Sequence, residues 1–149
     1  RAGNKPVILK LTANVTDVTE VAKAVEDAGA DAISLINTLS GMAVDIRSRR
    51  PVLGNVFGGL SGPAIKPVAL QAVYRVCQAV NIPVIGVGGI ASAEDALEFI
   101  LVGAHAVQIG SANFTDPECA FSVVSRIEEL CQELDISSWE AFRGRLETS

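Results

Sequence analysis

The sequence predicts an α/β fold of four consecutive βα units, the carboxyl-terminal half of a (β/α)8 TIM barrel, followed by a C-terminal helix. Two observations support this prediction. Four short apolar runs, at residues 7–10, 32–38, 84–89 and 106–111, each end in small or polar residues, and a helical pattern follows every one of them. Because a full barrel has eight such units and its active site at the carboxyl ends of the strands, four units are expected to hold half a site.

The first unit begins with residues 7–11, a continuous apolar run typical of a parallel strand that is covered on both faces. Asp17 and Glu20 form a predicted capping pair for the helix that follows, and Gly29 supplies its left-handed stop. The apolar face of this helix is expected to comprise Val18, Val21, Ala22 and Val25.

The second unit places polar residues at a strand end and then has a long connection. A strand over residues 32–36 ends in Asn37 and Thr38, and residues 39–65 follow as a loop whose length is typical of a functional segment. Lys66 begins the next helix, with Pro67 at a first-turn position that tolerates proline. The inward-facing residues of this helix are expected to be Ala69, Val73, Val76 and Val80.

The third unit has a strand over residues 82–87 that ends in Gly88 and Gly89, and Ser92 with Asp95 caps its helix. The fourth strand, residues 106–109, ends in a similar turn, Gly110-Ser111.

A helix then begins at Asp116-Pro117, and a last helix spans residues 137–146. The apolar face of the longer helix is expected to comprise Phe121, Val124, Ile127, Leu130 and Leu134. A doubly wound sheet is the alternative architecture. The barrel is favoured because no GxGxxG follows the first strand and no acidic residue ends the second, as a dinucleotide fold requires.

The composition narrows the class of protein. A net charge of −5 argues against a nucleic-acid partner, and the basic cluster is confined to Arg47, Arg49 and Arg50. No apolar run reaches the roughly 18 residues of a membrane span, and no leader pattern opens the chain. We therefore expect one cytoplasmic domain over residues 1–149 without a membrane contact. Because the chain starts at Arg1 without an initiator Met, we expect it to be a segment of a longer protein.

The cysteines do not predict a metal or redox site. Cys77, Cys119 and Cys131 fall inside helical patterns and lack CxxC or Cys/His spacing, so we expect reduced, buried, structural thiols. His105, the single histidine, precedes the fourth strand at its amino end. That end is opposite to the expected site, and the prediction for His105 is a structural role.

The candidate site residues follow from the strand ends. The two turns Gly88-Gly89 and Gly110-Ser111 allow close approach of backbone N–H groups to a phosphate, although each could simply shape a tight turn. Lys10 is a cation in an apolar strand and is expected to reach an anionic partner or water at the barrel mouth. Asn37 and Thr38 offer neutral donors and acceptors to a planar polar substrate, or cap their strand.

Several of these segments together resemble dihydroorotate dehydrogenase over essentially the whole chain. The most specific segment is GGLSGPAIKP at residues 58–67. The amino-acid sequences of the other segments are most similar to the class 1B, NAD-linked catalytic subunit. The remaining matching segments are Lys10-Leu11 with residues 14–17, residues 36–39, residues 86–90 and residues 110–114.

The resemblance implies an FMN-containing barrel that oxidises dihydroorotate to orotate in pyrimidine synthesis. The positions implied to contact FMN are Lys10, Ile36, Gly62, Gly88, Gly89, Gly110 and Ser111. The orotate contacts implied are Asn37 and Thr38, and Ser111 stands where a threonine is common. The implied base is a cysteine in the amino-terminal half of the barrel, so no catalytic residue is expected in this chain.

Four parallel strands alone would leave two open edges and an uncovered apolar interior, so we expect the chain to associate with further copies of itself or with the missing amino-terminal half. The resemblance implies one more partner, an electron-transfer subunit with FAD and a [2Fe–2S] cluster that passes electrons to NAD+. Alone, the chain is expected not to turn over. Two alternatives remain open at this point. One is another FMN barrel, similar to dihydropyrimidine dehydrogenase or dihydrouridine synthase, and the other is a non-catalytic phosphate-binding half-barrel.

Overall fold

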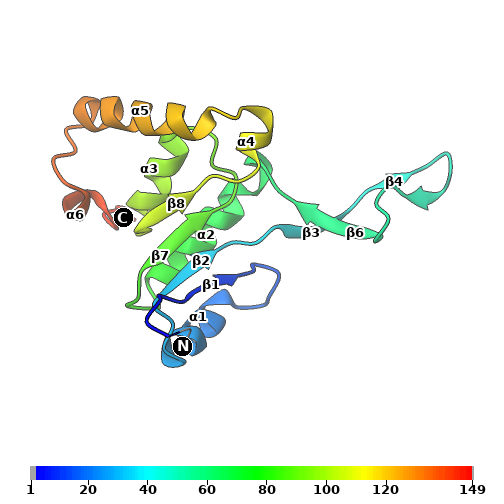
Figure 1. Ribbon diagram of the computed structural model, residues 1–149, viewed down its shortest axis with the longest axis horizontal. Helices are drawn as coiled ribbons and strands as arrows, with labels where there is room; N and C mark the ends of the chain where they lie inside the picture. Colours follow the sequence, from blue (N-terminus) through cyan, green and yellow to red (C-terminus); the bar gives the residue numbers. More distant parts are fainter. Residues whose placement is uncertain (1–2, 149) are drawn as a thin grey trace.

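The computed structural model describes residues 3–148 and contains a four-stranded parallel sheet (Figure 1). The strands are β1 (Ile8–Leu11), β2 (Ala32–Leu35), β7 (Val84–Val87) and β8 (Ala106–Gln108), in the order β1-β2-β7-β8. All three neighbouring pairs are parallel, and the four predicted strands are confirmed. Within this sheet the strands lie in the same order as in the sequence, without a reversal. A half-barrel has this order, whereas a doubly wound sheet reverses at a switch point.

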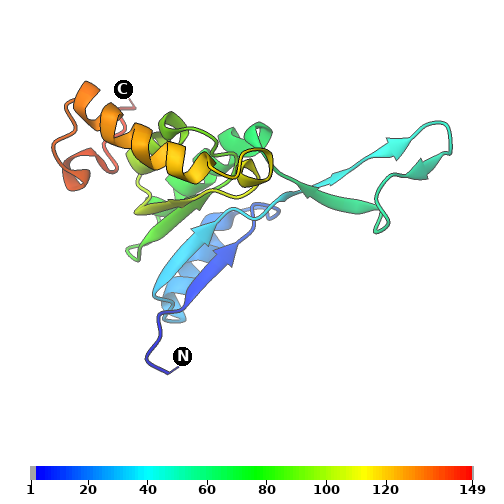
Figure 2. The ribbon, with the colours of Figure 1, turned by 45° about the horizontal axis from the view of Figure 1, so that its top comes forward.

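The connections between these strands carry α1 (Val18–Asp27), α2 (Lys66–Cys77) and α3 (Ala93–Leu101). Figure 2 shows α1 and α2 behind the sheet. The core lies between the sheet and these helices, and Phe99, Ile33 and Leu35 are fully buried in it. The predicted inward residues of this segment are all buried: Ala69, Val73 and Val76 lie in α2, which confirms that face, and Val80 follows the end of the helix.

Strand β1 differs from the prediction of a strand covered on both faces. Ile8 is 50% exposed and Leu9 38% exposed, and only Leu11 is buried. The reason is topological, because β1 pairs with β2 on one side and forms one edge of the sheet, as β8 forms the other. Open edges of parallel sheets are normally covered or paired.

The helix starts confirm one capping prediction and correct another. Ser92 accepts a hydrogen bond from the Asp95 N–H, and Asp95 accepts one from the Ser92 N–H, so the predicted box at α3 is complete. At α1, Asp17 is the cap but accepts from the N–H and hydroxyl of Thr19 rather than pairing with Glu20. Gly29 ends α1 with a φ of 84°, as predicted.

Replacing Ser92 by alanine is expected to lower the free energy of unfolding by about 1 kcal/mol, the usual effect of losing an N-cap hydroxyl. Urea denaturation measures this change in the completed protein, by which we mean this chain together with the amino-terminal half of the barrel. Ser92→Thr, which keeps the hydroxyl, is the matched control and should retain most of the stability. Equal losses in the two variants would contradict a capping role.

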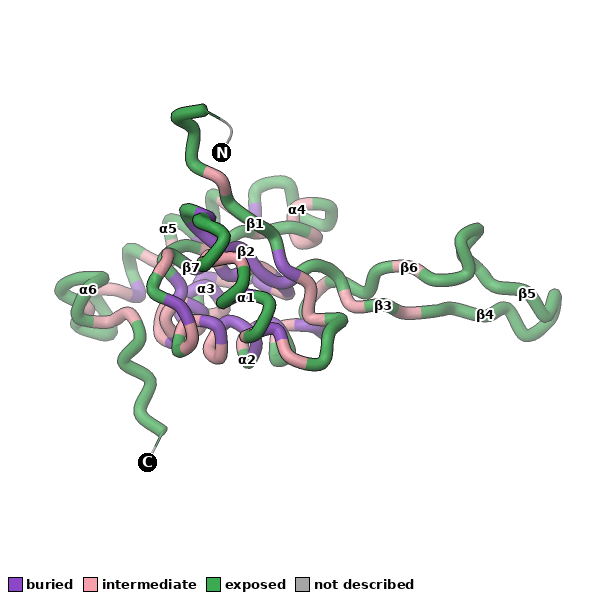
Figure 3. The backbone as a smooth tube through the Cα atoms, turned by 90° about the horizontal axis from the view of Figure 1, so that it is seen from below, coloured by how far each residue is buried: buried purple, intermediate pink, exposed green. Residues whose placement is uncertain are grey.

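Residues 39–65, which the sequence predicted as one long loop, contain two antiparallel strand pairs within residues 39–60, which we call the β-ribbon, and then the short 3-10 helix η1 (Pro63–Ile65). The inner pair joins β3 (Leu39–Met42) to β6 (Phe57–Leu60), and the outer pair joins β4 (Val44–Asp45) to β5 (Arg50–Pro51). The β-ribbon projects from the sheet and is largely exposed (Figures 1 and 3). Its glycines, among them Gly41 and Gly58, weaken the strand signal in the sequence.

The carboxyl-terminal helices also depart from the prediction. The short helix α4 (Ala112–Thr115) precedes α5 (Cys119–Glu133), whose buried residues are Cys119, Val123 and Leu130. The predicted face of α5 was therefore partly wrong. Phe121, Val124 and Leu134 are 78%, 60% and 58% exposed, because the buried stripe that packs toward α3 runs through Val123 instead. The last helix, α6 (Trp139–Phe142), is shorter than predicted because Arg143 is extended and Gly144 has a φ of 70°.

No helix within residues 3–148 is both long and apolar enough to cross a membrane. The same residues contain no cluster of three or more potential metal-ligating side chains. Cys77, Cys119 and Cys131 are unpaired thiols; Cys119 is buried and the other two are half-buried.

Burial raises the pKa of the Cys77 thiol to about 11, with Arg143 opposing the shift. Because the thiolate is the reactive form, Cys77 is expected to resist iodoacetamide in the folded protein at mildly alkaline pH. Peptide mass spectrometry after timed alkylation measures this resistance, with the urea-unfolded protein as control. Equal rates of alkylation in the two states would contradict it.

Candidate functional site

A cavity of about 300 Å³ opens at the carboxyl ends of the sheet strands. This volume lies at the lower end of the roughly 300–1,000 Å³ typical of small-molecule sites. The cavity is lined by Lys10, Ile36, Asn37, Thr38, Ser61, Gly62, Ile65, Val87, Gly88, Gly89, Ile90, Gly110, Ser111 and Phe114. Every residue that the sequence analysis named for a cofactor or substrate is in this set, so the predicted strand ends do converge on one site.

One side of the cavity carries the polar and charged side chains. Lys10 lies on the edge strand β1 and is exposed, so its ammonium needs no buried counter-charge. Asn37 follows β2, and its backbone N–H donates to Leu11 O at 2.9 Å, which ties it to the end of β1. The Asn37 side-chain oxygen accepts from the Thr38 N–H at 2.9 Å. These residues present a cation, an amide and a hydroxyl together.

Asn14 holds this side of the cavity in place. Its amide nitrogen donates to Thr38 O and to the Thr12 hydroxyl, both at 2.9 Å. Its amide oxygen accepts from the Ser40 N–H, also at 2.9 Å. The segment after β1 and the start of the β-ribbon are thereby fastened to each other, although Asn14 is not part of the cavity lining.

The opposite side of the cavity is built from glycine turns after β7 and β8. Gly88 has a φ of 139°, and a Cβ there would lie 2.7 Å from the Cβ of Ala69. Gly89 has a φ of 74°, and a Cβ there would lie 2.8 Å from the Lys66 backbone nitrogen and 2.9 Å from Gly62 O. Both positions therefore require glycine for their conformation and for their close packing.

These turns leave backbone donors free. Within residues 3–148, the N–H groups of Gly89, Ile90, Gly110 and Ser111 donate to no protein acceptor. A smaller hollow of about 190 Å³ adjoins the cavity here and shares five of its lining residues: Ser61, Gly62, Gly89, Ile90 and Ser111. Free backbone N–H groups along a concave wall favour an anion such as phosphate.

The cavity also includes residues that the sequence analysis did not select. Ser61 and Ile65 belong to the glycine-rich segment before α2. The distinctive sequence of this segment could have identified both residues as part of the site. Val87 and Ile90 flank the Gly88-Gly89 turn and contribute apolar wall. Phe114, which is 93% exposed on α4, lines the rim and carried no recognisable signal in the sequence.

Other chemically interesting residues lie away from the cavity. His105 precedes β8 and exchanges backbone and side-chain hydrogen bonds with Val84, at 2.7 Å and 3.4 Å, at the opposite end of the strands. None of the described cysteines lines the cavity. The site in this chain therefore has a cation, neutral polar groups and backbone donors, but no thiol.

Comparison with known proteins decides the family. The family model described as dihydroorotate dehydrogenase matches residues 1–131. The chain belongs to the dihydroorotate dehydrogenase family. This membership confirms the resemblance stated from the sequence, and it accords with a parallel sheet whose strand order is that of half a barrel.

Three relatives are each described as "Dihydroorotate dehydrogenase B (NAD(+)), catalytic subunit". The relative from Solidesulfovibrio magneticus is 64% identical over 146 residues, which cover 98% of this chain and 48% of the relative. The one from Maridesulfovibrio salexigens is 60% identical, with 97% and 48% covered, and the one from Geotalea uraniireducens is 58% identical, with 97% and 47% covered. The chain thus spans about half the length of the curated relatives it matches.

Proposed function

We propose that this chain supplies half of an FMN-dependent dihydroorotate dehydrogenase, which oxidises dihydroorotate to orotate in pyrimidine synthesis. The observation that carries the proposal is the convergence of Lys10, Asn37 and the two glycine turns on one cavity. The relatives described as catalytic subunits of this enzyme support the same assignment. A cytoplasmic location is part of the proposal.

The glycine turns fit the phosphate of FMN. The free N–H groups of Gly89, Ile90, Gly110 and Ser111 provide donors without a competing protein acceptor in the described chain. A Cβ at Gly110 would meet nothing within 4 Å, so the wall there is open to a ligand. Gly62, with φ 89° and ψ −172°, has a conformation that is essentially restricted to glycine and places Ser61 on the cavity rim.

The other side of the cavity fits the flavin ring and the substrate. The chemistry that bound FMN supplies is acceptance of a hydride from C6 of dihydroorotate. Lys10 and Ile36 line the cavity, where Lys10 would supply a positive charge that favours the anionic reduced form of a bound flavin and Ile36 would give the ring an apolar contact. Asn37 and Thr38 bind and orient the planar ring of orotate through their amide and hydroxyl groups.

The remaining parts of the enzyme lie outside this chain. Removal of the C5 proton requires a base, and within residues 3–148 no carboxylate, imidazole or thiol lines the cavity. We assign the base to a cysteine of the missing amino-terminal half and predict no turnover by this chain alone. The other proposed partners are further copies of the chain and a subunit with FAD and a [2Fe–2S] cluster that delivers electrons to NAD+. The open edges β1 and β8 are the surfaces on which the missing half would pair.

The experiment that tests this function is reconstitution with and without the missing half. The completed protein is expected to show the visible absorption of bound flavin and to oxidise dihydroorotate, while the chain alone does not. Turnover of dihydrouracil but not dihydroorotate would favour another FMN barrel. Failure of the completed, folded protein to hold any flavin would favour a non-catalytic phosphate-binding protein.

A further inference from the structure

Lys66 begins α2 and makes the shortest ion pairs in the described part of the chain that bridge two helices. Its ammonium lies 2.5 Å from Asp95 Oδ1 and 2.8 Å from Glu98 Oε2, both on α3. The side chains of Lys66 and Asp95 are only 26% and 17% exposed. Lys66 does not line the cavity, so any effect it has on a ligand must pass through a neighbour.

The neighbour is the turn after β7. Asp95, which accepts from Lys66, also accepts through Oδ2 from the Ala91 N–H at 2.9 Å and the Ser92 N–H at 3.0 Å. Ala91 directly follows Ile90, which lines the cavity and whose N–H donates to no protein acceptor within the described residues. The carboxylate therefore connects the Lys66 ammonium to the end of the turn that supplies phosphate donors.

The backbone of Lys66 contacts the other end of the same turn. A Cβ added at Gly89 would lie 2.8 Å from both the nitrogen and the Cβ of Lys66. The turn from Gly89 to Ala91 is thus enclosed between the Lys66 main chain and the carboxylate that the Lys66 side chain holds. Loss of the ammonium would leave Asp95 partly buried without its cation, which is costly.

Both charges are maintained at neutral pH. The hydrogen bond to Asp95, and then that to Glu98, raise the pKa of Lys66 above its usual value. Burial acts to raise the pKa of Asp95, but its hydrogen bonds with Lys66 and the Ala91 N–H outweigh burial and lower it. The pair is therefore a fixed electrostatic link between α2 and α3.

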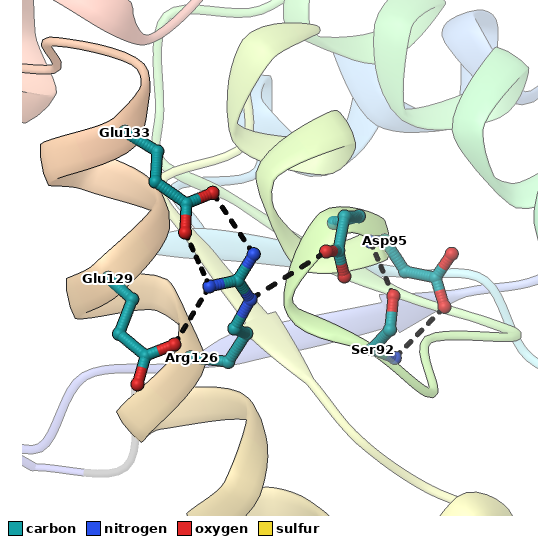
Figure 4. A network of polar contacts seen from close by, with 6 residues as sticks. Ser92, Asp95, Arg126, Glu129 and Glu133 are labelled. Carbon is teal, nitrogen blue, oxygen red and sulfur yellow. Dashed lines mark hydrogen bonds and ion pairs between the residues drawn. The ribbon is translucent and has the colours of Figure 1, made fainter.

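A second ion-pair network at the start of α3 offers a contrast (Figure 4). Arg126 of α5 lies 2.8 Å from Glu129, 2.7 Å from Glu133 and 4.0 Å from Glu94. These side chains are more exposed than the Lys66–Asp95 pair, and exposed pairs contribute little. Within residues 3–148, neither Arg126 nor its three glutamate partners form a hydrogen bond with the Gly89–Ala91 turn.

We propose that Lys66 is a positioning residue that, through Asp95, holds the Gly89–Ala91 turn in the shape that binds the phosphate of FMN. The inference rests on the proposed function, because that function gives the turn a phosphate ligand. The proposal predicts that loss of the Lys66 ammonium weakens binding of the FMN phosphate and leaves the affinity for the rest of the flavin unchanged.

The test compares FMN with riboflavin, which lacks the phosphate, in the completed protein. Flavin fluorescence titration gives both affinities. The wild-type protein is expected to bind FMN more tightly than riboflavin. Lys66→Met should weaken FMN binding by about tenfold and leave riboflavin binding unchanged, as expected when a group that orients a binding element is lost. Lys66→Arg, which keeps the charge, should recover part of the FMN affinity.

Arg126→Met is the matched control, since it removes an ion-pair network at the same helix start, and it should leave both affinities unchanged. Glu98→Gln, a milder variant, should give a smaller loss specific to FMN if Lys66→Met fails to fold. The positioning role would be overturned if Lys66→Met, or Glu98→Gln where that variant is used, kept the wild-type ratio of FMN affinity to riboflavin affinity. Equal losses of affinity for both ligands would overturn it as well. A wild-type protein without preference for FMN would overturn the phosphate site itself.

Discussion

Substituting Gly89 by alanine is expected to weaken FMN binding to the completed protein by at least about a hundredfold, because strain and misplacement act on the same turn. The new methyl group would meet the Lys66 nitrogen at 2.8 Å and Gly62 O at 2.9 Å, both backbone atoms that cannot rotate away. In addition, the φ of 74° at this position is unfavourable for any residue with a Cβ. The turn must therefore change shape and lose its aligned donors.

The measurement is the FMN dissociation constant by fluorescence, together with a thermal melt of the flavin-free protein. Gly54→Ala is the matched control, since a Cβ at Gly54 on the β-ribbon would meet nothing within 4 Å and its φ lies outside the left-handed range. The control should bind FMN like the wild type. Full FMN affinity in a folded Gly89→Ala variant would contradict the proposed turn.

Replacing Lys10 by methionine is expected to slow flavin reduction by dihydroorotate by about a hundredfold or more, the size of effect seen when a preorganised charge is removed from a reacting centre. Methionine keeps the length and apolar stem of the side chain but removes the cation from the cavity wall. FMN should remain bound, because the proposed phosphate donors lie on the turns after β7 and β8. The defect should therefore fall on the rate and not on cofactor content.

Stopped-flow reduction of the bound flavin measures this rate, and absorbance gives the cofactor content. Lys23→Met changes an exposed lysine of α1 outside the cavity and should reduce at the wild-type rate. If Lys10→Met reduced its flavin as fast as Lys23→Met, the role of the Lys10 charge would be disproved.

The sequence predicted well which strand-end residues come together at the cavity, for a physical reason. Strands of a parallel sheet all point their carboxyl ends to the same edge, so Lys10, Asn37, Gly88 and Ser111 could be grouped once the strands were recognised. Each strand was an apolar run that a helix pattern followed. Local sequence patterns alone were therefore enough to predict that these residues lie together. The roles of these residues toward FMN and orotate remain predictions.

Features that depend on contacts between distant segments were not predictable. The β-ribbon pairs Leu39 with Leu60 and Ser40 with Gly59, and glycine-rich strands carry little intrinsic signal. The exposure of β1 depends on which neighbours the sheet has, which a single strand does not reveal. Lys66 and Asp95 were both recognised as helix-start residues, but their contact joins two helices and leaves no mark in either segment.

The order of the sheet has a thermodynamic consequence for a bound flavin. Residues in or directly after β1, β2, β7 and β8 all line one cavity, so a single ligand that filled it would span the sheet from one edge to the other. By linkage, its binding energy then opposes every local opening that separates any of these strands. Amide hydrogen exchange at the edge strand β1 should therefore slow when the cofactor occupies the distant glycine turns after β7 and β8.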